Sequence, residues 1–209
     1  MLPLNTYYLM DCMEGMREYP DGYFDIAVVD PPYGISVNHN MGRRKGDKPS
    51  TYKKVDWDSS PPPAEYFLEL FRVSKNQVIW GGNYFALPPS PCWLCWDKGF
   101  SEDVSFASFE LAWTSFTGAS KRKCLSSVQN DRIHPTQKPI ALYSWVLNMF
   151  AQRGDRVIDT HTGSASSLIA CHRLGLEFVG FEIDGENHRA GYERLEQERA
   201  QVMLDLWGK

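Results

Sequence analysis

The chain has 209 residues, of which 43% are hydrophobic and 23% charged. This length predicts one domain, residues 1–209, with a single substantial core, and the composition is ordinary for a soluble globular protein. The formal net charge of −4 excludes a globally basic protein, so a nucleic-acid partner would need a local basic patch. The longest uncharged run, residues 76–96, contains five Gly or Pro residues and cannot form a membrane-spanning helix.

Five scattered cysteines with no secretory signal before them predict free thiols in a reducing compartment, and hence a cytoplasmic protein of a bacterium or of a phage-infected cell. Cys92 and Cys95 form a C-x-x-C pair inside a predicted strand. Residues i and i+3 of a strand point to opposite faces, which argues against a shared metal ion. We expect no metal site.

Apolar strand patterns alternate with helical patterns along the chain, which is typical of a parallel sheet covered on both faces. The predicted strands are 6–10, 25–29, 77–80, 91–97, 109–116, 156–159 and 177–183. The predicted helices are 12–19, 64–73, 140–150, 164–174 and a charged helix from residue 186 onward. The first strand, helix and second strand have the length of a βαβ unit. Ser164 is a candidate N-cap, and Gly175 follows the end of its helix.

Together these patterns predict an α/β fold with a doubly wound, mostly parallel, seven-stranded Rossmann-like sheet. The segments 91–97 and 109–116 would form an antiparallel hairpin at one edge. In open sheets of this kind, ligands bind beyond the carboxyl ends of the strands.

A buried strand ends abruptly at Asp30-Pro31-Pro32-Tyr33. Two prolines cannot continue a ladder, and their fixed φ angles hold Asp30 and the Pro31 carbonyl as a preset pair of acceptors. Two acceptors that face one point suit an NH₂ group, and Tyr33 offers a flat ring for stacking. A nucleobase fits that description, although a rigid turn after a strand is an equally good explanation of the motif alone.

A second constellation follows the strand 156–159, where Asp159-Thr160-His161-Thr162-Gly163-Ser164-Ala165-Ser166 leads into a helix. Its small residues let a ligand approach the backbone and the helix N-terminus. About twenty residues later, Glu182 ends the next strand, where an acid can accept hydrogen bonds from ribose hydroxyls. The pattern predicts a nucleoside site. It lacks the G-x-G-x-x-G of the dinucleotide folds, which disfavours NAD.

Two polar segments are predicted as loops that face nucleic acid, at about 36–63 and 117–133. The first has six basic residues against one acid between positions 43 and 54, and the second has three in succession. A solvated surface is the usual explanation of a charge run, but beside a base-sized pocket we favour phosphate contact. The predicted nucleic-acid-binding residues are Arg43, Arg44, Lys45, Lys48, Lys53, Lys54, Lys121, Arg122 and Lys123.

Taken together, the motifs resemble the β class of S-adenosylmethionine-dependent DNA amino-methyltransferases, which modify adenine N6 or cytosine N4. In that class the catalytic motif precedes the cofactor loop, as it does here, and the resemblance covers most of the chain. It implies that Asp30, Pro31, Pro32 and Tyr33 are catalytic and that S-adenosylmethionine is the cofactor. The implied cofactor-binding residues are Asp11, Cys12, Thr136, Lys138, Asp159, Thr160, Gly163, Ser164, Ala165, Ser166, Glu182 and Ile183.

The resemblance has departures. The family's cofactor loop usually reads D-P-F-x-G-S-G-[TS], whereas Thr160, His161 and Ala165 replace its Pro, Phe and second Gly. The short chain leaves only the two polar segments for target recognition, which makes high sequence specificity doubtful. Small enzymes of this family often come from restriction–modification systems or phages. DNA is the implied partner, and the sequence leaves a homodimer open.

The D-P-P-Y form of the motif favours adenine N6 as the methyl acceptor. Cytosine N4 is the first alternative. RNA or a protein amide is the second, and a non-catalytic nucleic-acid-binding module with a degenerate cofactor loop is the third.

Overall fold

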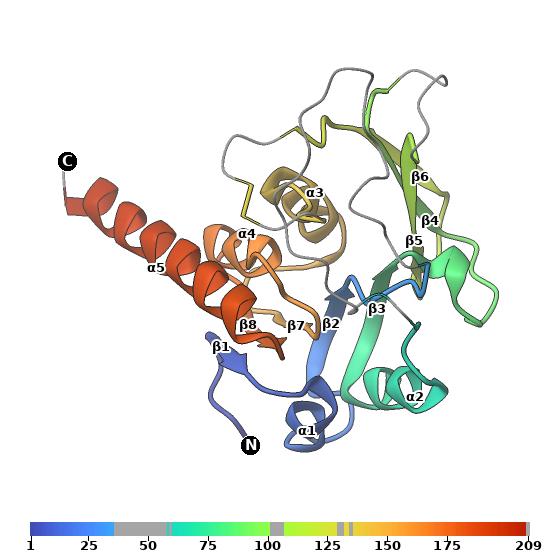
Figure 1. Ribbon diagram of the computed structural model, residues 1–209, viewed down its shortest axis with the longest axis horizontal. Coiled ribbons are helices and arrows are strands. Elements are labelled where there is room, and N and C mark those ends of the chain that lie inside the picture. Colours follow the sequence, from blue (N-terminus) through green and yellow to red (C-terminus); the bar gives the residue numbers. More distant parts are fainter. Residues whose placement is uncertain (36–57, 59, 101–106, 129–131, 134–135, 208–209) are drawn as a thin grey trace.

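The computed structural model describes residues 1–35, 58, 60–100, 107–128, 132–133 and 136–207, with side chains described up to residue 201. Eight strands form one sheet in the order β1-β8-β7-β2-β3-β5-β4-β6 (Figure 1). The strands are β1 Thr6–Leu9, β2 Phe24–Val29, β3 Ser74–Trp80, β4 Trp93–Asp97, β5 Phe109–Thr114, β6 Lys121–Cys124, β7 Arg156–Asp159 and β8 Glu177–Glu182. The helices are α1 Cys12–Arg17, α2 Ala64–Val73, the 3₁₀ turn η1 Gly82–Tyr84, α3 Ile140–Phe150, α4 Ser166–Leu174 and α5 Gly185–Trp207.

The sheet is parallel from β1 to β3 and then turns antiparallel through β5 and β4. This confirms the predicted α/β class with an antiparallel pair beyond the parallel strands. The central strands are apolar on both sides because each is covered twice, as expected for a parallel sheet with helices on both faces. In β2, Val28 and Val29 are both fully buried.

Two apolar clusters cover the two faces of the sheet. Figure 1 shows α1 and α2 on one side and α3, α4 and α5 on the other. Leu70 of α2 belongs to the first cluster with Val29, and Val146 of α3 to the second with Val28. The side chains of successive β2 residues thus pack into the cores on opposite faces of the sheet. This fixes the register of the strand and the place where it ends.

The two ends of the sheet differ from the sequence prediction. Residues 121–124 were predicted as part of a loop but form β6, which pairs in parallel with β4 and makes an eighth strand. The predicted βαβ unit at the start joins two parallel strands of the sheet through α1, but these strands are not neighbours, because β8 and β7 lie between β1 and β2. Pairing at a distance of more than 170 residues leaves no local signal.

The predicted N-cap of α4 also needs correction. Ala165, and not Ser164, occupies the N-cap position, in the left-handed conformation with φ of 61°. Gly175 ends the helix in the same conformation, as predicted. Non-glycine residues seldom adopt this conformation, so the tight path of the loop before α4 is specified by tertiary contacts.

No helix in the part of the chain that the structure describes combines the length and apolar character needed to cross a membrane.

Candidate active site

Asp30 lies immediately after β2, and the turn behind it is held by an acid that the sequence did not single out. The carboxylate of Asp58 accepts hydrogen bonds from the backbone N–H of Tyr33, at 2.7 Å, and of Gly34, at 2.9 Å. Asp58 is 4% exposed. Pro31 and Pro32 have no backbone N–H, so the first donors that follow Asp30 are the N–H groups of Tyr33 and Gly34. Both donate to Asp58.

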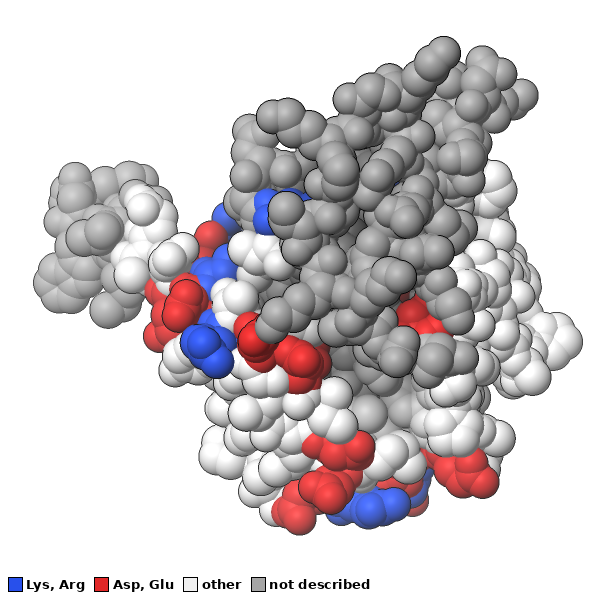
Figure 2. All heavy atoms as spheres, in the orientation of Figure 1, with Lys and Arg blue, Asp and Glu red and all other residues white. Residues whose placement is uncertain are grey.

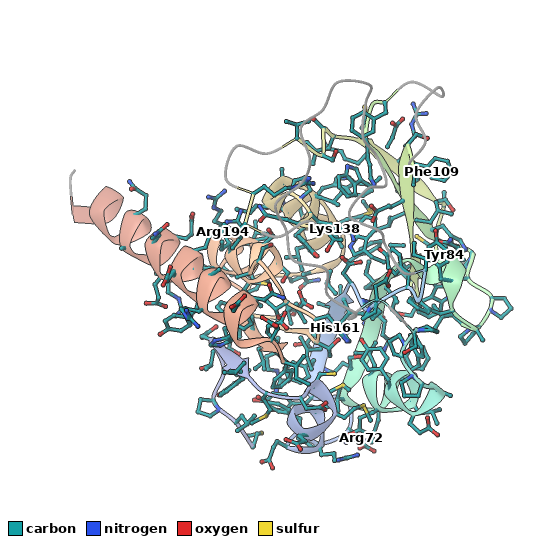
Figure 3. All side chains as sticks on the ribbon, in the orientation of Figure 1. Arg72, Tyr84, Phe109, Lys138, His161 and Arg194 are labelled. Carbon is teal, nitrogen blue, oxygen red and sulfur yellow. The ribbon has the colours of Figure 1, made fainter. Side chains whose placement is uncertain are left out.

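Tyr33 is directed back toward Asp30. Its hydroxyl donates to Asp30 Oδ1 at 2.7 Å, and its ring stacks on Tyr84 with centroids 5.0 Å apart. A side chain at Gly81 would meet Tyr33 Cε1 at 2.1 Å, so the glycine allows the ring to lie against the backbone. Tyr84 is 46% exposed and lies beyond β3 in Figure 3. That Tyr33 stacks a base therefore stays a prediction, with Tyr84 on one of its faces.

Lys138 meets the same carboxylate from the segment before α3. Its ammonium donates to Asp30 Oδ2 at 2.5 Å and lies 3.0 Å from Glu110 Oε2 of β5. Lys98, just after β4, is 2.6 Å from the other oxygen of Glu110. The Lys138 side chain is 4% exposed, and Figure 3 shows it near the end of β2. The sequence placed Lys138 with the cofactor, whereas its ammonium is engaged by two carboxylates around the catalytic motif.

Burial and neighbouring charges set the ionisation of this cluster. Burial raises the pKa of Asp30. The Lys138 ammonium lowers this pKa in part, and the charge of Glu110 raises it further. Burial also favours the neutral form of Glu110, but Lys138 and Lys98 more than offset it and lower the pKa of Glu110 to about 2. The pKa of Lys138 is raised, because Asp30 and Glu110 outweigh the effect of burial. Glu110 is therefore ionised and Lys138 protonated at neutral pH.

The loop between β7 and α4 is tied to the sheet by Asp159. This carboxylate accepts hydrogen bonds from the Ser167 hydroxyl and, at 3.1 Å, from the His161 N–H. Burial raises the pKa of Asp159 to about 7, with smaller contributions from the charges of Asp30 and Glu182. The ends of β2, β7 and β8 thus bring their three acids into electrostatic reach, as the sequence predicted for the carboxyl edge of a parallel sheet.

His161, one of the departures from the family pattern, is packed as an aromatic residue. The Thr160 hydroxyl is 2.6 Å from the Tyr66 hydroxyl and 3.0 Å from His161 Nδ1. The His161 and Tyr66 rings meet edge to face, with centroids 5.3 Å apart. Burial lowers the pKa of His161 to about 4, so the ring is neutral at physiological pH. A neutral aromatic ring thus occupies the position where the family usually has Phe.

Glu182 joins the loop to the end of β8. Its Oε2 accepts from the Gly163 N–H at 3.0 Å, and its Oε1 from the Asp184 N–H at 2.8 Å. Gly163 has a φ of 54°, and a Cβ there would have only Glu182 Oε2 within 4 Å, at 4.0 Å. Among the described residues, nothing else comes close to that position, and Ile183, next to Glu182 in the chain, is 72% exposed.

Most of the remaining predicted cofactor residues follow the carboxyl ends of the parallel strands β1 and β7. Asp11 caps α1 by accepting from the backbone N–H of Met13 at 2.7 Å, just beyond β1. Burial, followed by the Asp11 charge, raises the pKa of the Cys12 thiol to about 12. Ser164 and Ser166 contact each other through their hydroxyls at 3.1 Å. Thr136 lies two residues before Lys138, in the segment that leads to α3.

The predicted nucleic-acid-binding residues separate into two groups. Arg43, Arg44, Lys45, Lys48, Lys53 and Lys54 lie outside the described residues. Lys121, Arg122 and Lys123 lie on β6 and not on a loop, with the first two exposed. On the described part of the face in Figure 2, acidic and basic side chains are interspersed, and acidic ones gather along the lower rim.

Several residues of the site had not been predicted from the sequence, among them Asp58, Tyr66, Tyr84, Lys98, Glu110 and Ser167. Glu110 had one usable signal, since it is a lone acid in the otherwise apolar strand pattern Phe109–Thr114. Among the described residues, no three His, Cys, Asp or Glu side chains are grouped so as to hold a metal ion.

The chain is similar to known proteins in sequence and in fold. The chain is 26% identical over 204 residues to the putative methylase YubD of Escherichia coli K12, covering 88% of this chain and 87% of YubD. The structure of an M1.HpyAVI–SAM complex matches with a TM-score of 0.59 at 18% identity, covering 90% of this chain and 98% of that one. The cytosine-N4-specific PvuII DNA methyltransferase matches with a TM-score of 0.61 at 15% identity, covering 98% and 93%.

The fold, with acids at the ends of β2, β7 and β8, is that of the S-adenosylmethionine-dependent methyltransferases. A family model described as DNA methylase, N6_N4_Mtase, matches residues 79–193, which is more than half of the chain. The chain belongs to this DNA methylase family, whose cofactor is S-adenosylmethionine and whose substrate is DNA.

Proposed function

We propose that this protein methylates the N6 amino group of adenine in DNA. The observation that carries the proposal is the place of Asp30, a carboxylate at the end of β2 that shares one edge of the sheet with Asp159 and Glu182. In this proposal, the hydrogen-bond acceptor for the target amine and the nucleoside site lie on one rigid scaffold. Alignment of two reactants of this kind supplies a large part of the acceleration in group transfer.

In this proposal, Asp30 and the Pro31 carbonyl accept hydrogen bonds from the target amino group. The lone pair of that nitrogen is delocalised into the ring, and the two acceptors favour a pyramidal nitrogen that can attack. The nitrogen forms a bond to the methyl carbon as the carbon–sulfur bond breaks, and one N–H proton then leaves to Asp30 or to water. The base must first be extruded from the duplex, at a cost of a few kcal/mol.

S-adenosylmethionine supplies an electrophilic methyl group, and the residues present fit it. Gly163 leaves open space, and Glu182 keeps acceptor capacity beyond its two backbone hydrogen bonds, as a ribose partner requires. Exposed Ile183 offers an apolar contact beside Glu182. We propose that the rest of this site is formed by Asp11, Cys12, Thr136 and the β7–α4 loop residues Asp159, Thr160, Ser164, Ala165 and Ser166.

The proposal is tested by incubating DNA with the protein and labelled S-adenosylmethionine, followed by digestion to nucleosides. We expect N6-methyladenine. Label in N4-methylcytosine would replace the proposed acceptor by the alternative one, and binding of DNA and cofactor with no transfer would leave a non-catalytic module. Mapping the methylated bases along the same DNA would give the target sequence.

Asp30→Ala is expected to abolish transfer while cofactor affinity stays nearly unchanged, because Asp30 is proposed to contact the base only. Calorimetry measures the affinity, and a thermal scan checks that the variant is folded. Turnover of Asp30→Ala at the wild-type rate would refute the catalytic role of this carboxylate.

A further inference from the structure

Two partly buried ionic side chains of the site have no part in the proposed reaction. Glu110 and Lys98 come from β5 and the end of β4, strands that belong to the antiparallel part of the sheet. With Lys138 and Asp30 they form a row in which the charges alternate, from Lys98 through Glu110 and Lys138 to Asp30. The four formal charges cancel. A buried charge is costly unless it is paired, so each of the four depends on its neighbour.

The row ends on the carboxylate that the target amine needs. Asp30 Oδ1 accepts from the Tyr33 hydroxyl and Oδ2 from Lys138, while the Lys138 ammonium also lies 5.5 Å from the centroid of the Trp80 ring. A carboxylate offers about four acceptor positions, so two remain for a substrate N–H. Both oxygens are therefore oriented before the base arrives, and the free positions are fixed in space.

The surroundings leave Lys138 and Glu110 as the strong opposing charges on Asp30. Among the described residues, the other titratable groups that respond to the charge of Asp30 are Tyr33, Tyr66, Tyr143 and Asp159. The pKa values of the three tyrosines are raised well above their usual value, chiefly by burial, so they stay uncharged. The pKa of Asp159 is raised chiefly by burial and only to a smaller extent by the charges of Asp30 and Glu182, and its ionisation can be followed separately.

We propose that Lys138 and Glu110 are positioning residues for methyl transfer. Lys138 orients Asp30 and favours its ionised form. Glu110, which is also paired with Lys98, competes with Asp30 for the Lys138 ammonium and so weakens the effect of Lys138 on Asp30. This inference rests on the proposed function for its catalytic meaning. It gives Lys138 a different role from the cofactor contact that the resemblance implies.

The test uses two substitutions whose effects have opposite signs. Lys138→Met removes the cation 2.5 Å from Asp30, so the acid limb of the pH–rate profile for methyl transfer is expected to move up by about 1–3 pH units. Glu110→Gln removes an anion and leaves Lys138 to Asp30 alone, so the same limb is expected to move down. Lys138→Arg keeps the cation and should hold the limb near its wild-type position even if the rate falls.

The carboxyl carbon of Asp30, followed by NMR in the protein without ligands, gives a readout independent of activity. Its titration is expected to move up in Lys138→Met and down in Glu110→Gln. Lys75→Met is the matched control, since Lys75 forms a 2.7 Å ion pair with Asp25 on an exposed part of the surface, and it should change neither the profile nor the titration. Thermal scans identify any variant that fails to fold.

Shifts of the same sign in the two variants, or an unmoved Asp30 titration, would overturn the proposal. A loss of cofactor affinity in Lys138→Met with an unchanged Asp30 titration would also overturn it, because Lys138 would then be a cofactor-binding residue. If the wild type transfers no methyl group, the proposed function fails, and the NMR titration still decides whether Lys138 and Glu110 control Asp30.

Discussion

Gly191 offers a sharp test of how the last helix supports the cofactor loop. It is buried inside α5, where Gly→Ala would ordinarily stabilise a helix by about 0.8–1.0 kcal/mol. Here the added Cβ would lie 2.5 Å from the Gly163 carbonyl oxygen and 3.0 Å from Tyr7 Cε1. The same carbonyl accepts a 2.8 Å hydrogen bond from the Tyr7 hydroxyl, so it is held from two sides and cannot give way easily.

Overpacking of this kind costs about 1–3 kcal/mol. Subtracting the gain in helix propensity leaves a net destabilisation of about 0–2 kcal/mol for Gly191→Ala. For a chain of this size, 1 kcal/mol corresponds to about 2–4 °C in the thermal midpoint. Relief of the clash must shift the loop at Gly163, whose N–H bonds Glu182, so we also expect weaker binding of S-adenosylmethionine.

Gly185→Ala is the matched control, at the start of the same helix. A Cβ at Gly185 would have no neighbour closer than Leu9 Cδ2 at 4.0 Å, so the gain in propensity is not opposed. Differential scanning calorimetry and titration calorimetry on both variants measure the stability and the affinity. If Gly191→Ala raises the thermal midpoint as much as Gly185→Ala and leaves cofactor binding intact, the argument that α5 fixes the loop is refuted.

Two further predictions concern the ligands themselves. Glu182→Ala should weaken S-adenosylmethionine binding by about 1.5–3 kcal/mol, the range for hydrogen bonds to a charged group; unchanged affinity in calorimetry would mean that the ribose lies elsewhere. Replacing Arg43, Arg44 and Lys45 by Ala should reduce the slope of log K for duplex DNA against log salt by about 2.7, as expected for three lost phosphate contacts. Loss of binding at one sequence alone would instead indicate that these residues contact base edges.

The sequence predicted most accurately the elements whose signal is local. The helices Ala64–Val73 and Ile140–Phe150 have the predicted bounds, because each begins directly after a proline and carries an apolar face. The convergence of Asp30, Asp159 and Glu182 was also predictable, since parallel strands end at a common edge.

Features that depend on pairing across the chain were not predictable in the same way. The strand Lys121–Cys124 has three basic residues and no apolar alternation, so its sequence indicates a loop, and only pairing with β4 makes it a strand. The neighbours of β1 are likewise set by the fit of the whole sheet. A local pattern does not specify which distant strand becomes the neighbour of another.

The same reasoning explains why the resemblance assigned Lys138 differently from its contacts here. A motif gives the residue types near a site, but the direction of a long side chain depends on what else is buried with it. Glu110 lies 28 residues before Lys138 in the chain. It becomes the partner of Lys138 only because the sheet places β5 next to β3, which in turn pairs with β2. An ionised acid at that point attracts the ammonium because leaving either charge unpaired would cost several kcal/mol.

The departures in the cofactor loop also have structural explanations when they are taken together. His161 is kept neutral by burial and packs on Tyr66, so it preserves the aromatic contact without adding a positive charge. Ala165 accepts the left-handed conformation in which a glycine would be unstrained, and its methyl group is fully buried in the core. Burial of that methyl group offsets part of the backbone cost. Both replacements thus fit the loop without an added charge or an exposed strained side chain, which supports the proposal of a working cofactor site over a degenerate one.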